Sequence, residues 1–207
     1  MQTTNILSEP LVAWGVAARP LPGQAVSGDL HLVKSFSNGV LIAVLDGIGH
    51  GEEAAAAART GVAVLENHAG EPPVALVKHC HAALMKTRGV VLTLASVDPL
   101  AGTLAWLGVG SVEARLLRAD PRARSGERVV LRGGVVGYQL PELRVNNLFI
   151  AAGDLLVFAT DGVGPGLAPE RWTQNDSPEQ IANRIMEQHF KGTDDALVLV
   201  VRYLGLS

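Results

Sequence analysis

Two aspartates in matching segments are the residues of this chain that most readily suggest chemistry. Residues 44–51 read VLDGIGHG and residues 159–166 read ATDGVGPG, so that Asp46 and Asp161 each end an apolar run and precede a glycine. Asp-Gly is also a common hairpin turn, but a hairpin returns directly to a strand. Here one aspartate leads into an expected helix and the other into a segment rich in Gly and Pro. We therefore expect a bound ligand at these strand ends, which Gly47 would let a backbone carbonyl approach closely.

Further acids lie where apolar runs begin. Asp29 opens one expected strand, and Asp194 with Asp195 precedes the last one. Carboxylates brought together without a counter-charge repel one another and raise one another's pKa values, and metal ions resolve this conflict. All-oxygen ligand sets select hard cations such as magnesium or manganese, whereas zinc normally recruits Cys or His. The sequence therefore predicts a centre of divalent cations.

Paired cations at such a centre favour one reaction. Two ions that share a water lower its pKa and present hydroxide in line with a phosphoryl group whose oxygens they also neutralise. We therefore predict hydrolysis of a phosphomonoester without a covalent intermediate, carried by the four principal aspartates Asp29, Asp46, Asp161 and Asp194.

Length, charge and cysteine content narrow the class of protein. No stretch rich in Pro, Ser or charge resembles a linker, so we expect one domain over residues 1–207. The net charge of −3 argues against a nucleic-acid binder, since phosphate backbones are bound by clustered Lys and Arg. Cys80 is the only cysteine, and no apolar run approaches the roughly 20 residues that span a bilayer. We expect no membrane span and a cytoplasmic location.

Hydrophobic patterning predicts more strands than helices. Apolar runs bounded by turn residues predict strands over residues 11–18, 31–36, 40–45, 90–97, 103–107, 112–117, 129–131, 143–150, 155–160 and 196–203. Helical patterns cover residues 52–68, 74–88 and 178–190. Most spacings between strands are too short for crossover helices, which favours antiparallel pairing. We expect an α+β fold, an α-β-β-α sandwich of two antiparallel sheets flanked by helices.

His79 and His81 flank Cys80 on the second expected helix and invite a comparison with metal-binding motifs. Residues this close together on a helix point in different directions, since only positions three or four apart share a face. We therefore expect that these residues are not a metal site.

Four motifs in fixed order resemble a known family. They are SGD at 27–29, DGIGHG at 46–51, FATDGV at 158–163 and GTDDALVLVVR at 192–202. Together they resemble the SpoIIE-like branch of the metal-dependent protein phosphatases, the PPM family, and the likeness spans almost the whole chain. The resemblance implies the α-β-β-α sandwich of that family.

The resemblance also implies a role for each candidate ligand. In the family, the aspartate of the first DG motif bridges two divalent cations and the glycine carbonyl helps to bind one, which matches Asp46 and Gly47. The later aspartates of the family complete one cation site, which matches Asp161 and Asp194. Asp29 matches the acid that serves the other cation, directly or through water.

The chain departs from the family pattern at several positions. Many relatives carry a further acid where this chain has Leu32, so the second cation has fewer ligands. Residues 24–27 contain no arginine for the substrate phosphate, which leaves Arg19 as a distant substitute or as a solvated side chain. His50 lies two positions beyond the histidine of relatives and is a candidate general acid or a helix-start residue. Asp195 is expected to support the site rather than to bind a cation.

The implied activity is that of a phosphoserine or phosphothreonine protein phosphatase. The short chain resembles family members that act on phosphorylated regulatory proteins of the stressosome, its scaffold and antagonist proteins with STAS domains. The alternative is a catalytically weak module of the same fold that binds a phosphoprotein partner. The presence of all four principal acids favours the enzyme, because a binding module has no physical need for them.

Overall fold

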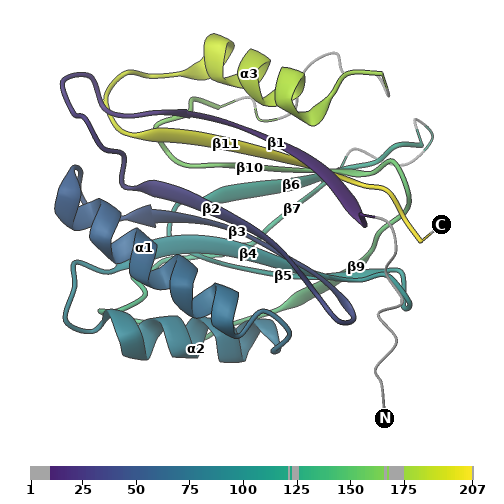
Figure 1. Ribbon diagram of the computed structural model, residues 1–207, viewed down its shortest axis with the longest axis horizontal. Coiled ribbons are helices and arrows are strands. Elements are labelled where there is room, and N and C mark those ends of the chain that lie inside the picture. Colours follow the sequence, from purple (N-terminus) through teal and green to yellow (C-terminus); the bar gives the residue numbers. More distant parts are fainter. Residues whose placement is uncertain (1–9, 121, 123–125, 166, 168–174, 207) are drawn as a thin grey trace.

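Two β-sheets packed face to face form the centre of the molecule, with helices on both outer faces (Figure 1). The structure is a computed structural model and describes residues 10–120, 122, 126–165, 167 and 175–206. The first sheet has the strand order β1 (Val12–Arg19), β11 (Ala196–Tyr203), β10 (Leu155–Ala159), β6 (Glu113–Leu117) and β7 (Glu127–Arg128). The second has the order β2 (Asp29–Phe36), β3 (Gly39–Gly47), β4 (Val90–Asp98), β5 (Thr103–Val109) and β8 (Leu131–Arg132), and β9 (Asn146–Phe149) also pairs with β5.

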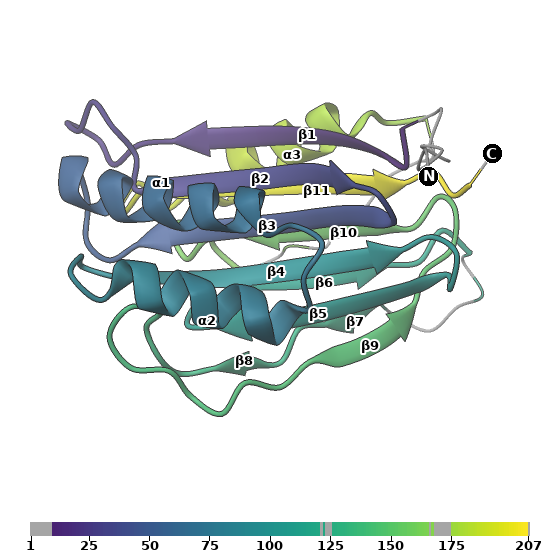
Figure 2. The same cartoon turned by 60° about the horizontal axis from the view of Figure 1, so that its bottom comes forward.

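The helices lie on opposite sides of this pair of sheets. In the described part of the chain they are α1 (Glu52–Asn67), α2 (Pro73–Leu84) and α3 (Pro178–His189). The first two lie side by side over the second sheet, and α3 lies over the first (Figures 1 and 2). The predicted α-β-β-α sandwich is therefore confirmed. Among the described residues, no helix has the length and apolar character that crossing a bilayer requires.

Buried strands contribute to two apolar layers at once, because successive side chains of a strand point to opposite faces. In β3, Val40, Ile42 and Val44 face the other sheet. Its alternate residues Leu41 and Leu45 pack beneath α1 and α2. The uninterrupted apolar run predicted here is thus a strand covered on both faces.

Most of the strand pairs are antiparallel, as predicted, with one exception. Strand β8 runs parallel to β5 over two residue pairs, Gly108 with Leu131 and Val109 with Arg132. The single strand predicted for residues 129–131 is wrong, because β7 belongs to the first sheet and β8 to the second. The apolar run at residues 129–131 crosses between the two sheets, with Val130 exposed, and so does not pair as one strand.

Candidate metal centre

The candidate aspartates lie where strands of both sheets end, at the left in Figure 1. Within the second sheet, β2 and β3 form a hairpin that places Asp29 directly opposite Asp46. The N–H of Gly47 donates to the carbonyl of Gly28 at 3.1 Å, which continues the pairing beyond the two acids. The hairpin predicted from the turn at residues 37–39 is the reason these two carboxylates meet.

The first sheet contributes its acids at the same end. Strand β10 ends at Ala159, and β11 pairs antiparallel beside it, so Asp161 and the pair Asp194 and Asp195 lie next to each other. Thr160 joins the two sheets: its hydroxyl donates to a carboxylate oxygen of Asp29 at 2.7 Å and accepts from the N–H of Leu197 at 2.9 Å. Thr160 was missed in the sequence, where it reads as the last residue of an apolar strand.

The electrostatics of the centre are those of crowded acids. The pKa of Asp46 rises to about 8, chiefly through burial and then through the charges of Asp29, Asp161, Asp194 and Asp195, in that order. The pKa of Asp29 rises to about 7, chiefly through burial, although the hydrogen bond from Thr160 lowers it. All the sequence-predicted aspartates are therefore close enough to influence one another.

This donor set fits divalent cations. It offers carboxylate oxygens from four strand ends, and the cost of holding their charges together falls when a cation lies between them. The described part of the centre offers no sulfur or imidazole that shares these contacts, so hard cations such as magnesium and manganese match it better than zinc. The chemistry of the side chains and their raised pKa values thus support the cation centre that the sequence predicts.

Asp195 has a different task from its neighbour. Its two carboxylate oxygens accept hydrogen bonds from the N–H groups of Leu21 and Gly28, each at 2.7 Å. These bonds attach the loop between β1 and β2 to the start of β11, and so position the strand end that carries Asp29. Asp194 in turn accepts the N–H of Asp195 at 2.8 Å through one of its carboxylate oxygens.

The two residues predicted to assist at the substrate lie at the edge of the centre. Arg19 pairs with Ala196 at the end of β1, which brings it to the aspartate end of the sheet. Its guanidinium lies 5.3 Å from the ring centroid of Phe190. His50 is exposed in the loop between β3 and α1. The structure thus brings Arg19 and His50 to the same end of the molecule as the acids.

Lys191 is a cation of the centre that the sequence did not reveal. Its ammonium group donates to the backbone carbonyl of Asp161 at 2.6 Å. It also lines a cavity of about 140 Å³ together with Glu113, Thr160 and Asp161. A lysine three positions before the acidic pair was the available signal, but only the folded chain shows that it reaches Asp161.

Comparisons with known proteins find a matching family model and a curated relative. Residues 37–204 match the family model of Stage II sporulation protein E (SpoIIE). The phosphoserine phosphatase RsbX of Bacillus subtilis (strain 168) is 21% identical over 173 residues, which cover 84% of this chain and 85% of RsbX. The predicted resemblance to the SpoIIE-like branch is thus confirmed, and RsbX is one member that the chain resembles.

Solved structures extend the likeness to the whole fold. A chain described under "The bacterial stressosome: a modular system that has been adapted to control secondary messenger signaling" is 30% identical, with a TM-score of 0.84, over 92% of this chain and 99% of that one. RsbX in complex with magnesium has a TM-score of 0.80 at 19% identity, over 93% and 95% of the two chains. The catalytic domain of the serine/threonine phosphatase PstP with two manganese ions has a TM-score of 0.67 at 18% identity, over 93% and 98%.

Proposed function

The chain belongs to the SpoIIE family of PPM-type protein serine/threonine phosphatases, and on that premise we propose that its aspartate centre hydrolyses phosphoserine or phosphothreonine esters with two divalent cations, manganese or magnesium. The observation that carries this proposal is the convergence of carboxylates from both sheets. Burial and mutual repulsion raise the pKa values of Asp29 and Asp46 to about 7 and about 8, an arrangement that bound cations would relieve.

Each acid has a proposed place in the centre. Asp46 would contact both cations and the carbonyl of Gly47 would help to bind one, and Asp161 with Asp194 would complete the site of one. Asp29 would serve the other cation, held in place by its hydrogen bond from Thr160. Leu32 lies three residues further along β2 and contributes no acid there, so the second cation should bind more weakly.

These positions give the cations and the side chains different roles in the proposed reaction. When bound, the cations lower the pKa of an attacking water and offset the negative charge of the phosphoryl oxygens. The aspartates would hold the cations in fixed positions, because their strands are fixed by pairing and by the hydrogen bonds of Asp195. Arg19 would bind the substrate phosphate, and the exposed imidazole of His50 would donate a proton to the departing serine or threonine oxygen.

The substrates we propose are phosphorylated STAS-domain proteins of the stressosome, its scaffold and antagonist proteins. This part of the proposal is supported by the likeness to RsbX and to the chain described with the bacterial stressosome. We also propose that residues 1–207 form a single domain that works in the cytoplasm. The free thiol of Cys80 fits a reducing compartment.

The decisive experiment measures phosphate release from a phosphoserine STAS-domain protein. We expect release with manganese, none with EDTA, and a loss of about a thousandfold or more in Asp46→Asn, since activation of water by metals supplies much of such catalysis. Asp161→Asn and Asp194→Asn should lose activity through weaker binding of the same cation.

The same assay separates the enzyme from the catalytically weak binding module. Equal release in manganese, in EDTA and in Asp46→Asn would contradict the proposal, provided that pull-down shows the phosphoprotein still bound. Normal cation affinity in both Asp161→Asn and Asp194→Asn would remove those two residues from the ligand set.

A further inference from the structure

A second group of metal-ligating side chains lies at the far end of α1 from the aspartate centre. Helix α1 has 16 residues, so about 24 Å separates its start, beside Gly47, from its last turn. At that last turn, His68 ends α1, Glu71 lies in the link to α2, and His79 lies within α2. These three side chains come from three consecutive segments and meet on the outer face of the molecule.

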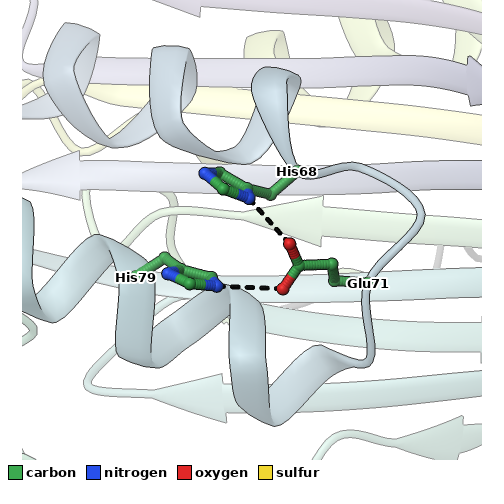
Figure 3. Close-up of side chains that lie close together, drawn as sticks. All are labelled: His68, Glu71 and His79. Atoms are coloured by element: carbon green, nitrogen blue, oxygen red, sulfur yellow. Dashed lines mark hydrogen bonds and ion pairs between the residues drawn. The ribbon is translucent and has the colours of Figure 1, made fainter.

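The geometry of this group is compact (Figure 3). Nδ1 of His68 lies 2.7 Å from one carboxylate oxygen of Glu71, and Nε2 of His79 lies 2.9 Å from the other. The two imidazole rings are stacked, with centroids 4.4 Å apart and planes within 15°. The three ligand atoms all lie within 4.8 Å of one another.

We propose that His68, Glu71 and His79 form a zinc site that joins the end of α1 to α2, independent of the aspartate centre. Two imidazole nitrogens and one carboxylate are a ligand set that zinc accepts, with a water in the fourth position. Hard cations prefer all-oxygen ligand sets, so magnesium and manganese should bind to these three side chains more weakly than zinc does.

Small side-chain movements suffice to admit the ion. Zinc binds nitrogen and oxygen at about 2.0–2.2 Å, so neighbouring ligands in a tetrahedral site lie roughly 3.3 Å apart. The contacts to Glu71 must lengthen slightly, and each histidine must present a deprotonated nitrogen where it now points toward a carboxylate oxygen. All three side chains are 39–45% exposed, so their rotamers can adjust without repacking the core.

The neighbouring histidine of α2 shows why the site was not visible in the sequence. Nδ1 of His81 accepts the N–H of Gly137 at 3.0 Å, away from the group formed with His79. His81 is therefore not part of this group, and the proposed site departs from the sequence prediction in its use of His79. The partner of His79 is His68, eleven positions earlier, and their meeting depends on how α2 folds back on α1.

The experiment titrates zinc into the full chain in millimolar magnesium, which occupies the aspartate centre and competes little for histidine. Calorimetry should show one zinc bound per chain, and cobalt as a probe should give the visible bands of tetrahedral coordination. At a hundredfold excess of zinc over its dissociation constant, the melting temperature should rise by about 5–10 °C.

Matched variants decide the location of the site. His68→Ala and His79→Ala should each weaken zinc binding about a hundredfold or more, whereas His81→Ala on the same helix should bind as the wild type does. Each variant's melting temperature in EDTA confirms that it folds. Asp46→Asn should bind zinc normally, so the outcome does not depend on phosphatase activity. Absence of zinc binding in magnesium, binding that survives His79→Ala, or binding lost in Asp46→Asn would each overturn the proposal.

Discussion

Asp29 and Asp46 face each other across two hydrogen-bonded strands, a position in which like charges destabilise a sheet. The structure gives Asp29 one neutral donor, the hydroxyl of Thr160, and surrounds both acids with further carboxylates. Such an arrangement has a high cost in the folded chain without a counter-charge. At the scale of single residues, the pair therefore suits cation binding at a cost to the stability of the cation-free chain.

Substitution can separate the proposed phosphate ligand Arg19 from Lys191, which supports the backbone of Asp161. We expect Arg19→Ala to raise the KM for a phosphoserine peptide about tenfold, because one charge-assisted hydrogen bond contributes about 1.5–3 kcal/mol. The manganese affinity should not change, since Arg19 contacts the ring of Phe190 and no acid of the centre in the described residues. Lys191→Ala should also weaken manganese binding, because its ammonium group fixes the backbone of Asp161.

Steady-state kinetics over a range of peptide and manganese concentrations provide this measurement. Arg128→Ala, an exposed arginine on the edge strand β7, is the matched control and should behave as the wild type does. An unchanged KM in Arg19→Ala would show that its guanidinium does not hold the phosphate.

The contact between β3 and α1 shows how elements position the centre. A Cβ atom added to Gly47 would lie 2.1 Å from the carbonyl oxygen of Ala54 in the first turn of α1. Backbone cannot move aside as a flexible side chain can, so Gly47→Ala should lower the free energy of unfolding by about 1–3 kcal/mol. Activity should fall as well, because the strand end that carries Asp46 must shift.

Urea denaturation and phosphate release measure both effects. Gly133→Ala is the control, because nothing lies within 4 Å of a Cβ placed at Gly133, and it should stay close to the wild type. Equal stability of the two variants would contradict the close approach of α1 to the end of β3.

Elements with strong local patterns could be predicted from the sequence, and contacts between distant elements could not. The run at residues 40–45 and the turn before it sufficed for a buried hairpin, and hence for the meeting of Asp29 and Asp46. By contrast, Lys191 reaches Asp161 only because the end of α3 returns to the segment after β10, where Gly164 N–H donates to His189 at 2.7 Å. The apolar pattern at residues 129–131 does not show that the chain passes there from the first sheet to the second.

At the scale of the whole molecule, the cation-free chain should lose stability as the pH rises. The folded-state pKa values of Asp46 and Asp29, about 8 and about 7, lie above the ordinary value of 3.8, so the folded state binds more protons than the unfolded state between these limits. Their protonated forms therefore favour folding at low pH, and this contribution is lost as the pH passes through 7 and 8. Between pH 6.5 and 8 the loss should reach about 2 kcal/mol.

Thermal unfolding in EDTA from pH 6.5 to 8.5 tests this expectation. Burial lowers the pKa of His31 from its ordinary value of 6.5, so that histidine opposes the trend only at the lower end of this window. Manganese should largely remove the decline, and Asp46→Asn should reduce it in EDTA. A melting temperature that stays constant or rises across this window in EDTA would refute the raised pKa values.

The hydrogen bond from Thr160 to Asp29 crosses from one sheet to the other, and the proposed cation ligands are divided between the same two sheets. In the proposed arrangement neither sheet alone supplies all four carboxylates, so a displacement of one sheet relative to the other would change their spacing. The affinity for manganese would then depend on the distance between the two sheets. A partner that binds an outer helix and shifts its sheet would change the affinity for manganese, and with it catalysis, without contacting an aspartate.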